Sequence, residues 1–593
     1  MTFTTRPEIT GTFGVAASTH WIASTVGMGV MERGGNAFDA AVAMGFVLHV
    51  VEPHLNGPLG DMPALIRPAG DAAPTVVCGQ GPAPAAATIE RYRAEGLEAI
   101  PGSGLLAAVV PGAFDAWMLI ARDHGTWRLA DLLAPAIHYA EAGHPLLPRV
   151  AETIAGLAEF FRKEWPTSAE TWLPGGRPPE PGALFANPWL AATWRRLVEE
   201  AGGGTREAEI DAARRVFAEG FVAEAVDAWC REARVMDGAG ERRGGVLTGQ
   251  DMAGWRAGYE APVSVDYEGW TVWKPGFWSQ GPLFLQALRL LEGAVPEDDT
   301  AFVHHVAEAL KLAMADREAY YGDPLHHDIP AETLLSRAYA AGRQGLIGED
   351  ASREQRPGRI PGLEAWAEAS VERATRPAAG MGAGGGEPTM AHLHARGEDR
   401  SPAEGDTVHI DVIDRWGNMV SATPSGGWLQ ASPTVPGLGM PLGSRAQMFW
   451  LDPDLPTSLA PGRRPRTTLS PSMAEGPLGA LAFGTPGGDQ QDQWQLPFFL
   501  RLLHRGMNLQ ESIDAPLFLI SHVPASFQPR VARPGYLMVE PGIDADALAA
   551  RGHDVAVAEP WSVGRLTAAL REPSGLLRAA ATPRLMQAYA VGR

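Results

Sequence analysis

The stretch GDTVHIDVID, residues 405–414, decides the fold, together with the turn RWGN, 415–418, and the segment MVSATPS, 419–425. From Thr407 to Ile413 polar residues alternate with apolar ones, the period of two that places each set on one face of a strand. The turn contains Gly and Asn and reverses the chain, so we predict a β-hairpin. Residues from about 374 to 406 form a glycine-rich leader that lacks the apolar surface needed to order itself. A flexible leader ending at a strand-initial threonine is what a self-cleaving proenzyme requires.

Cleavage between Asp406 and Thr407 would give this threonine two functions. Its hydroxyl is a weak nucleophile, but a free α-amine on the same residue, with a reference pKa of about 7.7 to 8.0, can accept the hydroxyl proton at neutral pH. Thr407 would then be both nucleophile and base. The local pattern alone also fits an ordinary edge hairpin, so the remaining sequence must decide.

Blocks of sequence before and after the hairpin identify a family by their order. They are GVAASTH (14–20), GGNAFDAAVA (34–43), VEP (51–53), VPGA (110–113), ALKLAMADR (309–317), GDP (322–324), PGRRPRTTLSP (461–471) and GTPGG (484–488). Together they resemble, over nearly the whole chain, the γ-glutamyltranspeptidase family of N-terminal-nucleophile hydrolases. The resemblance implies a mixed α/β fold, a four-layer αββα sandwich. It also implies two subunits from one precursor, a large one of residues 1–406 and a small catalytic one of residues 407–593, together forming one interleaved domain.

Composition excludes several other classes of protein. The 593 residues are 45% hydrophobic and 20% charged, as in ordinary globular proteins, and the formal net charge of −20 argues against nucleic acid or anionic membranes as partners. No apolar run approaches the roughly 18 residues of a membrane span, and the start MTFTTRP has no apolar signal core, so we expect a cytoplasmic protein. The expected partners are a small-molecule amide substrate and the two subunits themselves, with a homo-oligomer left open.

No metal site or cofactor is predicted. Cys78 and Cys230 are the two cysteines, and neither has a ligand-like spacing. The histidine pairs His304–His305 and His326–His327 lack the i, i+4 relation and a partner carboxylate set.

Local patterns also predict individual helices. Asn36, with Asp39 three residues later, is typical of a helix N-cap, and the following segment is apolar on nearly every face up to Val51. Such a helix is expected to be buried, packed on a sheet. A second helix is indicated between Thr300 and Tyr321 by apolar residues at helical spacing.

The resemblance assigns further site residues. Gly487 and Gly488 stand where the family has its oxyanion hole, a role suited to backbone N–H groups that no Cβ shields. Ser425 is assigned to orienting the Thr407 hydroxyl, and Thr423 to structural support. Thr467 and Thr468 stand where the family has a substrate-binding Ser-Ser pair, and their hydroxyls keep the same donor and acceptor capacity.

Departures from the family concern substrate specificity. Ile89 replaces the arginine that holds a γ-glutamyl α-carboxylate, and Met448 replaces the aspartate that faces its α-ammonium group. Arg445 replaces a glutamine of the same loop, and Gly427 replaces an asparagine. Losing one buried partner of a charge costs about 2 to 5 kcal/mol when the other charge remains. The chemistry of the family is therefore expected to persist without its best-known specificity.

Three hypotheses follow. The first is an autoprocessed threonine amidohydrolase for a small acyl amide without the glutamyl α-ammonium, with Arg445 favouring an anionic acyl group, as in the oxamate-hydrolysing or glutaryl-acylase branches. The second is true γ-glutamyl hydrolase or transferase activity, with Arg91 or Arg93 as relocated anchors. The third is an unprocessed, inactive scaffold, which the presence of nucleophile, hydroxyl and glycine pair disfavours.

Overall fold

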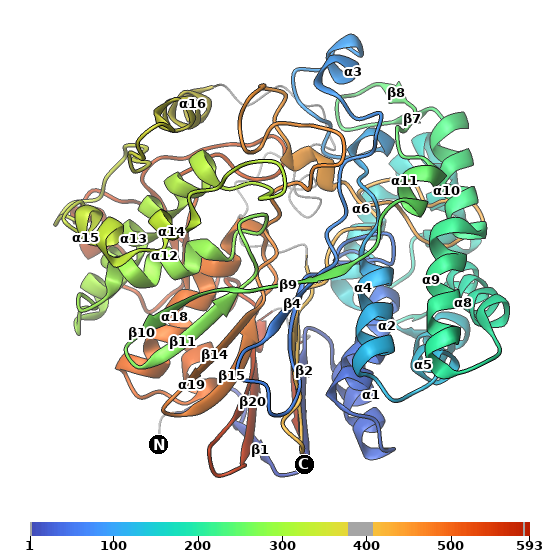
Figure 1. The fold of residues 1–593 in the computed structure, drawn as a ribbon, viewed down its shortest axis with the longest axis horizontal. Coiled ribbons are helices and arrows are strands. Elements are labelled where there is room, and N and C mark those ends of the chain that lie inside the picture. Colours follow the sequence, from blue (N-terminus) through green and yellow to red (C-terminus); the bar gives the residue numbers. More distant parts are fainter. Residues whose placement is uncertain (1–2, 377–406, 585–587) are drawn as a thin grey trace.

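The computed structural model describes residues 3–376, 407–584 and 588–593, so Asp406 and nearly all of the predicted leader lie outside the described residues. Two seven-stranded sheets stand face to face in the centre of the molecule (Figure 1). The strand order is β21-β2-β12-β13-β3-β4-β9 in one sheet, which we call the nucleophile sheet, and β1-β20-β19-β15-β14-β11-β10 in the other, the glycine sheet. Every pairing in both sheets is antiparallel.

Each sheet combines strands from both sides of Thr407. The nucleophile sheet consists of β2 (Gly14–Ser18), β3 (Ala64–Arg67), β4 (Thr75–Cys78), β9 (Gly258–Glu260), β12 (Ile410–Asp414), β13 (Met419–Ala422) and β21 (Tyr589–Gly592). The glycine sheet consists of β1 (Ile9–Gly11), β10 (Val263–Tyr267), β11 (Trp270–Lys274), β14 (Ser472–Gly476), β15 (Gly479–Gly484), β19 (Thr567–Arg571) and β20 (Leu577–Ala581). A smaller sheet holds β16 (Phe518–Ile520), β17 (Tyr536–Val539) and β18 (Asp554–Val557).

Helices cover the outer face of each sheet (Figure 1). The nucleophile sheet is covered by α1 (Trp21–Glu32), α2 (Ala37–Val51), α4 (Ala113–His124), α5 (Leu129–Ala142), α6 (Pro148–Glu164), α8 (Pro188–Ala201), α9 (Arg206–Glu219) and α10 (Phe221–Glu232). The glycine sheet is covered by α12 (Pro282–Leu291), α13 (Asp299–Tyr320), α18 (Gln491–His504) and α19 (Leu509–Asp514). The helices α3 (Ile89–Ala94) and α16 (Glu364–Thr375) lie toward the top of Figure 1.

Three buried apolar layers hold these four layers of secondary structure together. One lies between the helices and the nucleophile sheet, one between the two sheets, and one between the glycine sheet and its helices. The middle layer contains Val15 and Ile413 from the nucleophile sheet and Ala482 and Ala569 from the glycine sheet. Burial of apolar surface on both faces of both sheets is the dominant stabilising term. The αββα sandwich that the resemblance implies is confirmed.

The predicted hairpin forms as β12 and β13, with Val412 opposite Val420. Its first strand begins at Ile410 and not at Thr407, and Thr407 joins the returning segment through an isolated β-bridge with Ser425. Its alternation has the expected effect, because Ile410 and Val412 pack toward the helices, whereas Ile413 faces the other sheet. By the same period of two, Thr407 lies at the end of the face that looks between the sheets. The hairpin therefore delivers its first residue to one end of the sandwich.

The two helices predicted from local patterns are also confirmed. Asn36 caps α2 with a complete capping box in which Asp39 is the partner, and every residue of α2 is buried. Helix α13 runs from Asp299 to Tyr320, within one residue of the predicted start and end.

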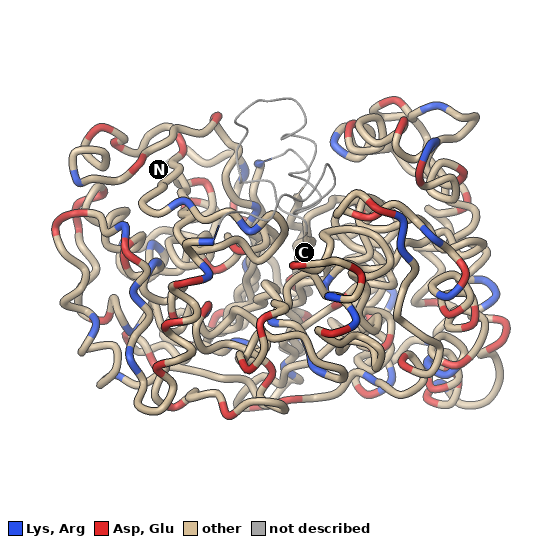
Figure 2. Tube along the Cα trace, turned by 90° about the horizontal axis from the view of Figure 1, so that it is seen from above, with Lys and Arg blue, Asp and Glu red and all other residues tan. Residues whose placement is uncertain are grey.

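Charged residues of both signs are distributed over both halves of the molecule in the view of Figure 2. Within residues 3–376, 407–584 and 588–593, no helix is long and apolar enough to cross a membrane.

A pH dependence of stability follows from His49, which is fully buried in the last turn of α2. Burial lowers the pKa of His49 to about 3, against an ordinary value of 6.5. The folded state favours the neutral His49 ring, whereas the unfolded chain binds a proton below pH 6.5. The contribution of His49 to the free energy of unfolding is therefore fully present above pH 6.5 and is lost as the pH falls toward 3. We expect the free energy of unfolding to fall by up to about 1.4 kcal/mol per pH unit for this one group.

Denaturant unfolding at pH 7.5, 6.5 and 5.5 tests this prediction. His49→Met should flatten the slope below pH 6.5, whereas His138→Met, a change of an exposed side chain on α5, should keep it. Equal slopes in wild type and His49→Met would show that His49 is not a source of acid sensitivity.

Candidate active site

Thr407 is fully buried and its hydroxyl faces that of Ser425. The two Oγ atoms are 3.1 Å apart, and the two residues also form an antiparallel β-bridge. Sequence reasoning paired these residues from the returning strand, and the fold brings them into hydrogen-bond contact. A hydroxyl at this distance can orient the Thr407 Oγ or accept its proton.

A buried polar network follows Thr407 along the inner face of β12. His409 Nδ1 lies 2.9 Å from the Thr423 hydroxyl, and His409 Nε2 lies 3.0 Å from an oxygen of Asp411. The other Asp411 oxygen accepts a 2.7 Å hydrogen bond from Thr567 on β19, which ties the two sheets together. Thr423 is therefore held in this network through His409.

Gly484 at the end of β15 packs directly against the imidazole of His409. A Cβ at Gly484 would lie 2.2 Å from His409 Cε1, so only glycine allows this approach. Since His409 is two residues from Thr407 and Gly484 is three residues from Gly487, the glycine pair lies at the same end of the sandwich as Thr407.

The glycine pair itself has a conformation that requires glycine. Gly487 has φ of +124°, and a Cβ there would lie 2.2 Å from the ring of Trp494. Gly488 has φ of +51° and its carbonyl accepts a 3.2 Å hydrogen bond from Gln280 Nε2. The turn is thus fixed by packing and hydrogen bonding, as an oxyanion site requires.

Thr467 and Thr468 lie at the same end of the glycine sheet as the glycine pair, because they precede β14, whose first residue pairs with Phe483 near the end of β15. Thr467 forms a bridge with Ser279, and its N–H donates to the carbonyl of Trp278 at 2.8 Å. The Thr468 hydroxyl is buried and has no hydrogen-bond partner among the described residues. A buried hydroxyl without a partner is a group that a ligand can satisfy.

Arg445 is placed differently from the prediction. Its Nε and Nη2 donate to the two carboxylate oxygens of Asp61 at 2.6 and 2.9 Å, and both side chains are buried. Burial raises the pKa of the Asp61 carboxyl, an effect that the Arg445 guanidinium opposes. The ion pair neutralises Arg445, so the additional positive charge expected from this residue is already matched within the protein.

Asp61 also holds Ser425 directly. The backbone N–H of each residue donates to the carbonyl of the other at 2.9 Å. Asp61 therefore links the backbone of Ser425 to the side chain of Arg445.

Met448 and Ile89 leave the two family anchor positions apolar. Met448 belongs to a small buried cluster with Trp428 and Phe527, and its sulfur lies 4.0 Å from Nη1 of Arg445. Ile89 begins α3 and packs against a buried cluster that contains Phe449.

The two relocated anchors considered from sequence have other partners. Arg91 forms an exposed ion pair with Glu95 at 2.8 Å, and Arg93 donates to the carbonyl of Leu451 at 3.0 Å.

Gly427 cannot be replaced by the asparagine of the family without rearrangement. Its φ is +65°, and a Cβ would lie 3.1 Å from the Gly60 nitrogen and 3.2 Å from Gly57 Cα. The segment around Gly427 approaches the backbone of Gly57 and Gly60 too closely for a side chain at position 427, which explains why a glycine stands there.

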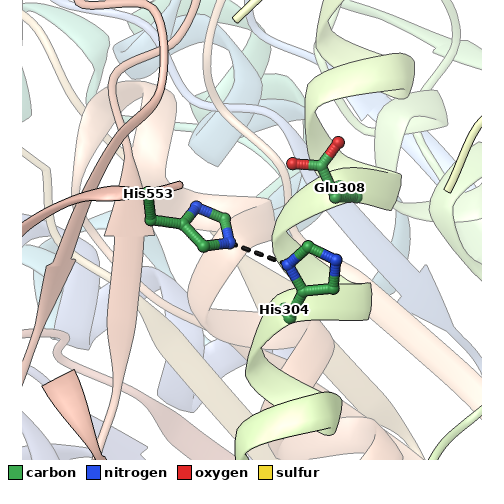
Figure 3. Close-up of side chains that lie close together, drawn as sticks. All are labelled: His304, Glu308 and His553. Atoms are coloured by element: carbon green, nitrogen blue, oxygen red, sulfur yellow. Dashed lines mark hydrogen bonds between the residues drawn. The ribbon is translucent and has the colours of Figure 1, made fainter. Parts of the chain in front are cut away.

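A cluster that could hold a metal ion lies at α13, where sequence analysis found no partner carboxylate for His304 (Figure 3). That reasoning overlooked Glu308, four residues after His304, and could not foresee His553, whose Nε2 lies 2.9 Å from His304 Nδ1. One ligand atom from each of the three residues lies within 4.8 Å of the others. The Glu308 carboxylate is, however, bound by Lys311 at 2.6 Å and by Arg356 at 2.9 Å, and these two cations oppose a metal ion.

Sequence reasoning missed Asp61, His409 and Asp411. The alternation that placed Thr407 on the inner face also placed His409 and Asp411 there, so that signal was present. Asp61 had no local signal, because its partners Ser425 and Arg445 lie more than 360 residues further along the chain.

Comparison with known proteins agrees with this geometry. The family model for γ-glutamyltranspeptidase matches residues 23–592. The oxamate amidohydrolase proenzyme of Klebsiella pneumoniae subsp. pneumoniae is 32% identical over 590 residues, covering 97% of both chains. Among solved structures, LmbA2991HD is 53% identical with a TM-score of 0.90, covering 100% of both chains. Cephalosporin acylase from Bacillus halodurans is 27% identical with a TM-score of 0.81, covering 100% of this chain and 98% of the other.

A match over almost the entire length, the four-layer sandwich, and a relative above 30% identity lead to one conclusion: this chain belongs to the γ-glutamyltranspeptidase family of N-terminal-nucleophile hydrolases.

Proposed function

We propose that the protein is a proenzyme that cleaves itself between Asp406 and Thr407, and then hydrolyses the amide of a small acyl group lacking an α-ammonium. The observation that carries this proposal is the contact between the Thr407 and Ser425 hydroxyls at the end of the inter-sheet layer. Similarity to an oxamate amidohydrolase proenzyme and to a cephalosporin acylase supports an amide outside the γ-glutamyl class.

The proposed reaction uses the chain's own groups. The α-amine of Thr407, free after cleavage, accepts the proton of its hydroxyl, and the Oγ attacks the substrate carbonyl carbon. Backbone N–H groups at Gly487 and Gly488 stabilise the oxyanion. The amine leaves with a proton from the α-ammonium, and water then hydrolyses the Thr407 ester, releasing the acid and restoring the hydroxyl.

Specificity follows from what surrounds the site. A zwitterionic glutamyl head would lose water at Ile89 and Met448 without gaining a charged partner, and burying an unpaired charge is unfavourable. Arg445 is matched by Asp61, which leaves no unpaired carboxylate there for an α-ammonium. The pocket therefore favours an acyl group without that ammonium.

Glutaryl-p-nitroanilide and γ-glutamyl-p-nitroanilide differ only by the α-ammonium and test this specificity. We expect kcat/KM to be higher for the glutaryl compound by at least tenfold, about 1.4 kcal/mol in the transition state. Thr407→Ala, purified in the same way, serves as the control that measures hydrolysis by contaminating amidases. A tenfold preference for the γ-glutamyl compound would show that the anchors have been rebuilt elsewhere and that the enzyme is a γ-glutamyl hydrolase or transferase.

The contribution of Arg445 is tested with two variants. Arg445→Gln leaves Asp61 buried and unpaired, so both substrates should lose activity alike. The double variant Asp61→Asn with Arg445→Gln keeps the site neutral and should recover part of that loss. Loss of activity in Arg445→Gln that the double variant does not recover would instead show that Arg445 binds the carboxylate, which both substrates carry.

A further inference from the structure

Four buried arginines gather behind the glycine pair and the Thr467–Thr468 segment. We call this group the arginine cluster: Arg317 of α13, Arg373 of α16, Arg466 and Arg530, with Glu318 and Asp489 as its acidic members. The exposed fraction of the four arginine side chains ranges from 0% to 9%. Four guanidinium groups face two carboxylates, so two positive charges are unmatched within the cluster.

The cluster is attached to the candidate oxyanion turn. Arg317 Nη1 donates to Asp489, the residue after Gly488, and also to Gln280 Oε1 at 2.8 Å. Gln280 in turn donates to the Gly488 carbonyl. The cluster therefore supports the glycine pair from behind.

Arg466 attaches the cluster to the proposed substrate segment, since it directly precedes Thr467. Its Nη2 donates to Glu318 Oε1 at 3.1 Å. Its Nε and Nη1 are buried and have no hydrogen-bond partner among the described residues.

Arg530 attaches the cluster to the Met448 loop. Its Nη2 donates to the carbonyls of Gln447 and Phe449, the two neighbours of Met448. The segment that carries Arg530 is anchored at Ser526, whose N–H and hydroxyl both donate to Asp489. Arg530 thus links the loop around Met448 to Asp489 beside the glycine pair, and its Nε has no hydrogen-bond partner among the described residues.

Both arginines stay charged at neutral pH. Burial lowers the pKa of Arg466 to about 10, and the charges of Arg317 and Arg373 add to this effect. Burial also lowers the pKa of Arg530 to about 9, with the charges of Arg466 and Arg373 adding to it. A protein that buries positive charge without full pairing holds a site where an anion is strongly favoured.

We propose that Arg466 and Arg530 form an anion subsite that receives a carboxylate on the acyl group of the substrate, with the Thr468 hydroxyl as a further donor. The inference rests on the proposed function and deepens it, because it names the substrate class: the monoamide of a dicarboxylic acid. Guanidinium N–H groups bind carboxylates through charge-assisted hydrogen bonds, and the anion reduces the unmatched charge from two to one. The subsite also gives the substrate carboxylate a positively charged partner, which Arg445 does not provide because it is bound to Asp61.

If Arg466 had a purely structural function, Arg466→Met would lower the melting temperature, whereas the anion subsite predicts otherwise. Glu318 also accepts a hydrogen bond from Arg317 Nε at 3.1 Å and forms an ion pair with Arg317, so it stays paired when Arg466 is removed. Removing one guanidinium from a cluster with excess positive charge relieves repulsion. Under our proposal Arg466→Met keeps or raises the melting temperature while it impairs recognition of the anionic substrate.

Two pairs of amides isolate the carboxylate. Glutaryl- and glutaramoyl-p-nitroanilide differ only by a terminal carboxylate against a neutral amide, and oxamate and oxamide differ in the same way at the shortest length. We expect wild type to prefer the anionic member of at least one pair by tenfold or more in kcat/KM. Arg466→Met and Arg530→Met should each lower that preference at least tenfold, and Arg466→Lys should restore part of it.

Arg501→Met is the matched control. Arg501 is also buried, burial lowers its pKa to about 10, and it lies near the far end of α18 from Gly488. This variant should keep the preference of the wild type even if it lowers the melting temperature.

The outcomes separate this inference from the proposed function. Hydrolysis that depends on Thr407 but shows no anionic preference, or a preference unchanged in Arg466→Met and Arg530→Met, overturns the anion subsite and leaves the amidase intact. If none of the four amides is hydrolysed, calorimetry of the processed protein with glutaramate and its neutral diamide, glutaramide, decides the subsite. Tighter binding of glutaramate that is lost in Arg466→Met supports it, and equal binding of the two compounds overturns it.

Discussion

Thr407→Ala should leave the precursor as a single chain of 593 residues and abolish amide hydrolysis. Autocleavage needs a hydroxyl that attacks the preceding carbonyl and shifts the acyl group from nitrogen to oxygen, and alanine has none. Turnover should fall on the order of 10⁶-fold, as when the nucleophile of a serine protease is removed. Denaturing gels and intact mass measure the first effect: wild type should give fragments 1–406 and 407–593 that stay associated.

Thr407→Ser is the matched control, because serine keeps the hydroxyl and loses only a methyl group. It should still be cleaved at the same bond. If Thr407→Ala is cut as fully as wild type, another protease makes the cut and Thr407 is not the nucleophile. An uncut wild type would instead support the scaffold hypothesis.

The parts of the fold that the sequence predicted well are those with short-range signals. The hairpin 407–425 is encoded by alternation and a Gly-Asn turn, and helix α2 by a capping box and an unbroken apolar segment. Both signals act within about four residues, so they can be read without knowledge of distant contacts. The same alternation placed Thr407 on the inner face, and the contact with Ser425 follows from the register of the hairpin.

Charge pairing was the part that the sequence could not predict. Arg445 replaces a neutral residue of the family, and by itself it indicates a more cationic pocket. Its partner Asp61 lies 384 positions earlier in the chain, so the compensation is visible only once β3 and β13 have paired and brought the two loops together. The anion subsite is the opposite case to Arg445, because there the structure shows positive charge that is not fully paired. Arg466 and Arg530 could not be recognised as a site from sequence, since only the structure shows their buried N–H groups without a partner.

Family membership and substrate specificity therefore rest on different evidence. The family follows from matches along the whole chain and from the sandwich. The substrate depends on a few side chains at one end of that sandwich, where this sequence differs from γ-glutamyl enzymes at Ile89 and Met448. A functional site on a shared fold must be argued from its own charges and hydrogen bonds.

Ser425→Ala should slow both self-cleavage and turnover, each by about 10² to 10³-fold. The Ser425 hydroxyl is 3.1 Å from the nucleophilic Oγ, and removal of one catalytic hydrogen bond of this kind costs on the order of 2.7 to 4 kcal/mol by analogy with an oxyanion donor. The substitution removes the hydroxyl without moving the backbone, because two backbone hydrogen bonds with Asp61 hold residue 425 in place whatever its side chain. Rates of precursor cleavage and kcat of the processed enzyme measure the two effects separately.

Ser432→Ala distinguishes a catalytic hydroxyl from a structural one. The Ser432 hydroxyl is equally buried and donates to the carbonyl of Leu442 at 3.0 Å, so its loss should lower stability by about 1 kcal/mol without slowing self-cleavage. If the Ser425 hydroxyl serves both reactions, the two rates in Ser425→Ala fall together, because the same Oγ attacks the Asp406 carbonyl first and the substrate later. A loss of turnover with normal self-cleavage would confine Ser425 to substrate chemistry, and unchanged rates in both would remove its hydroxyl from the site.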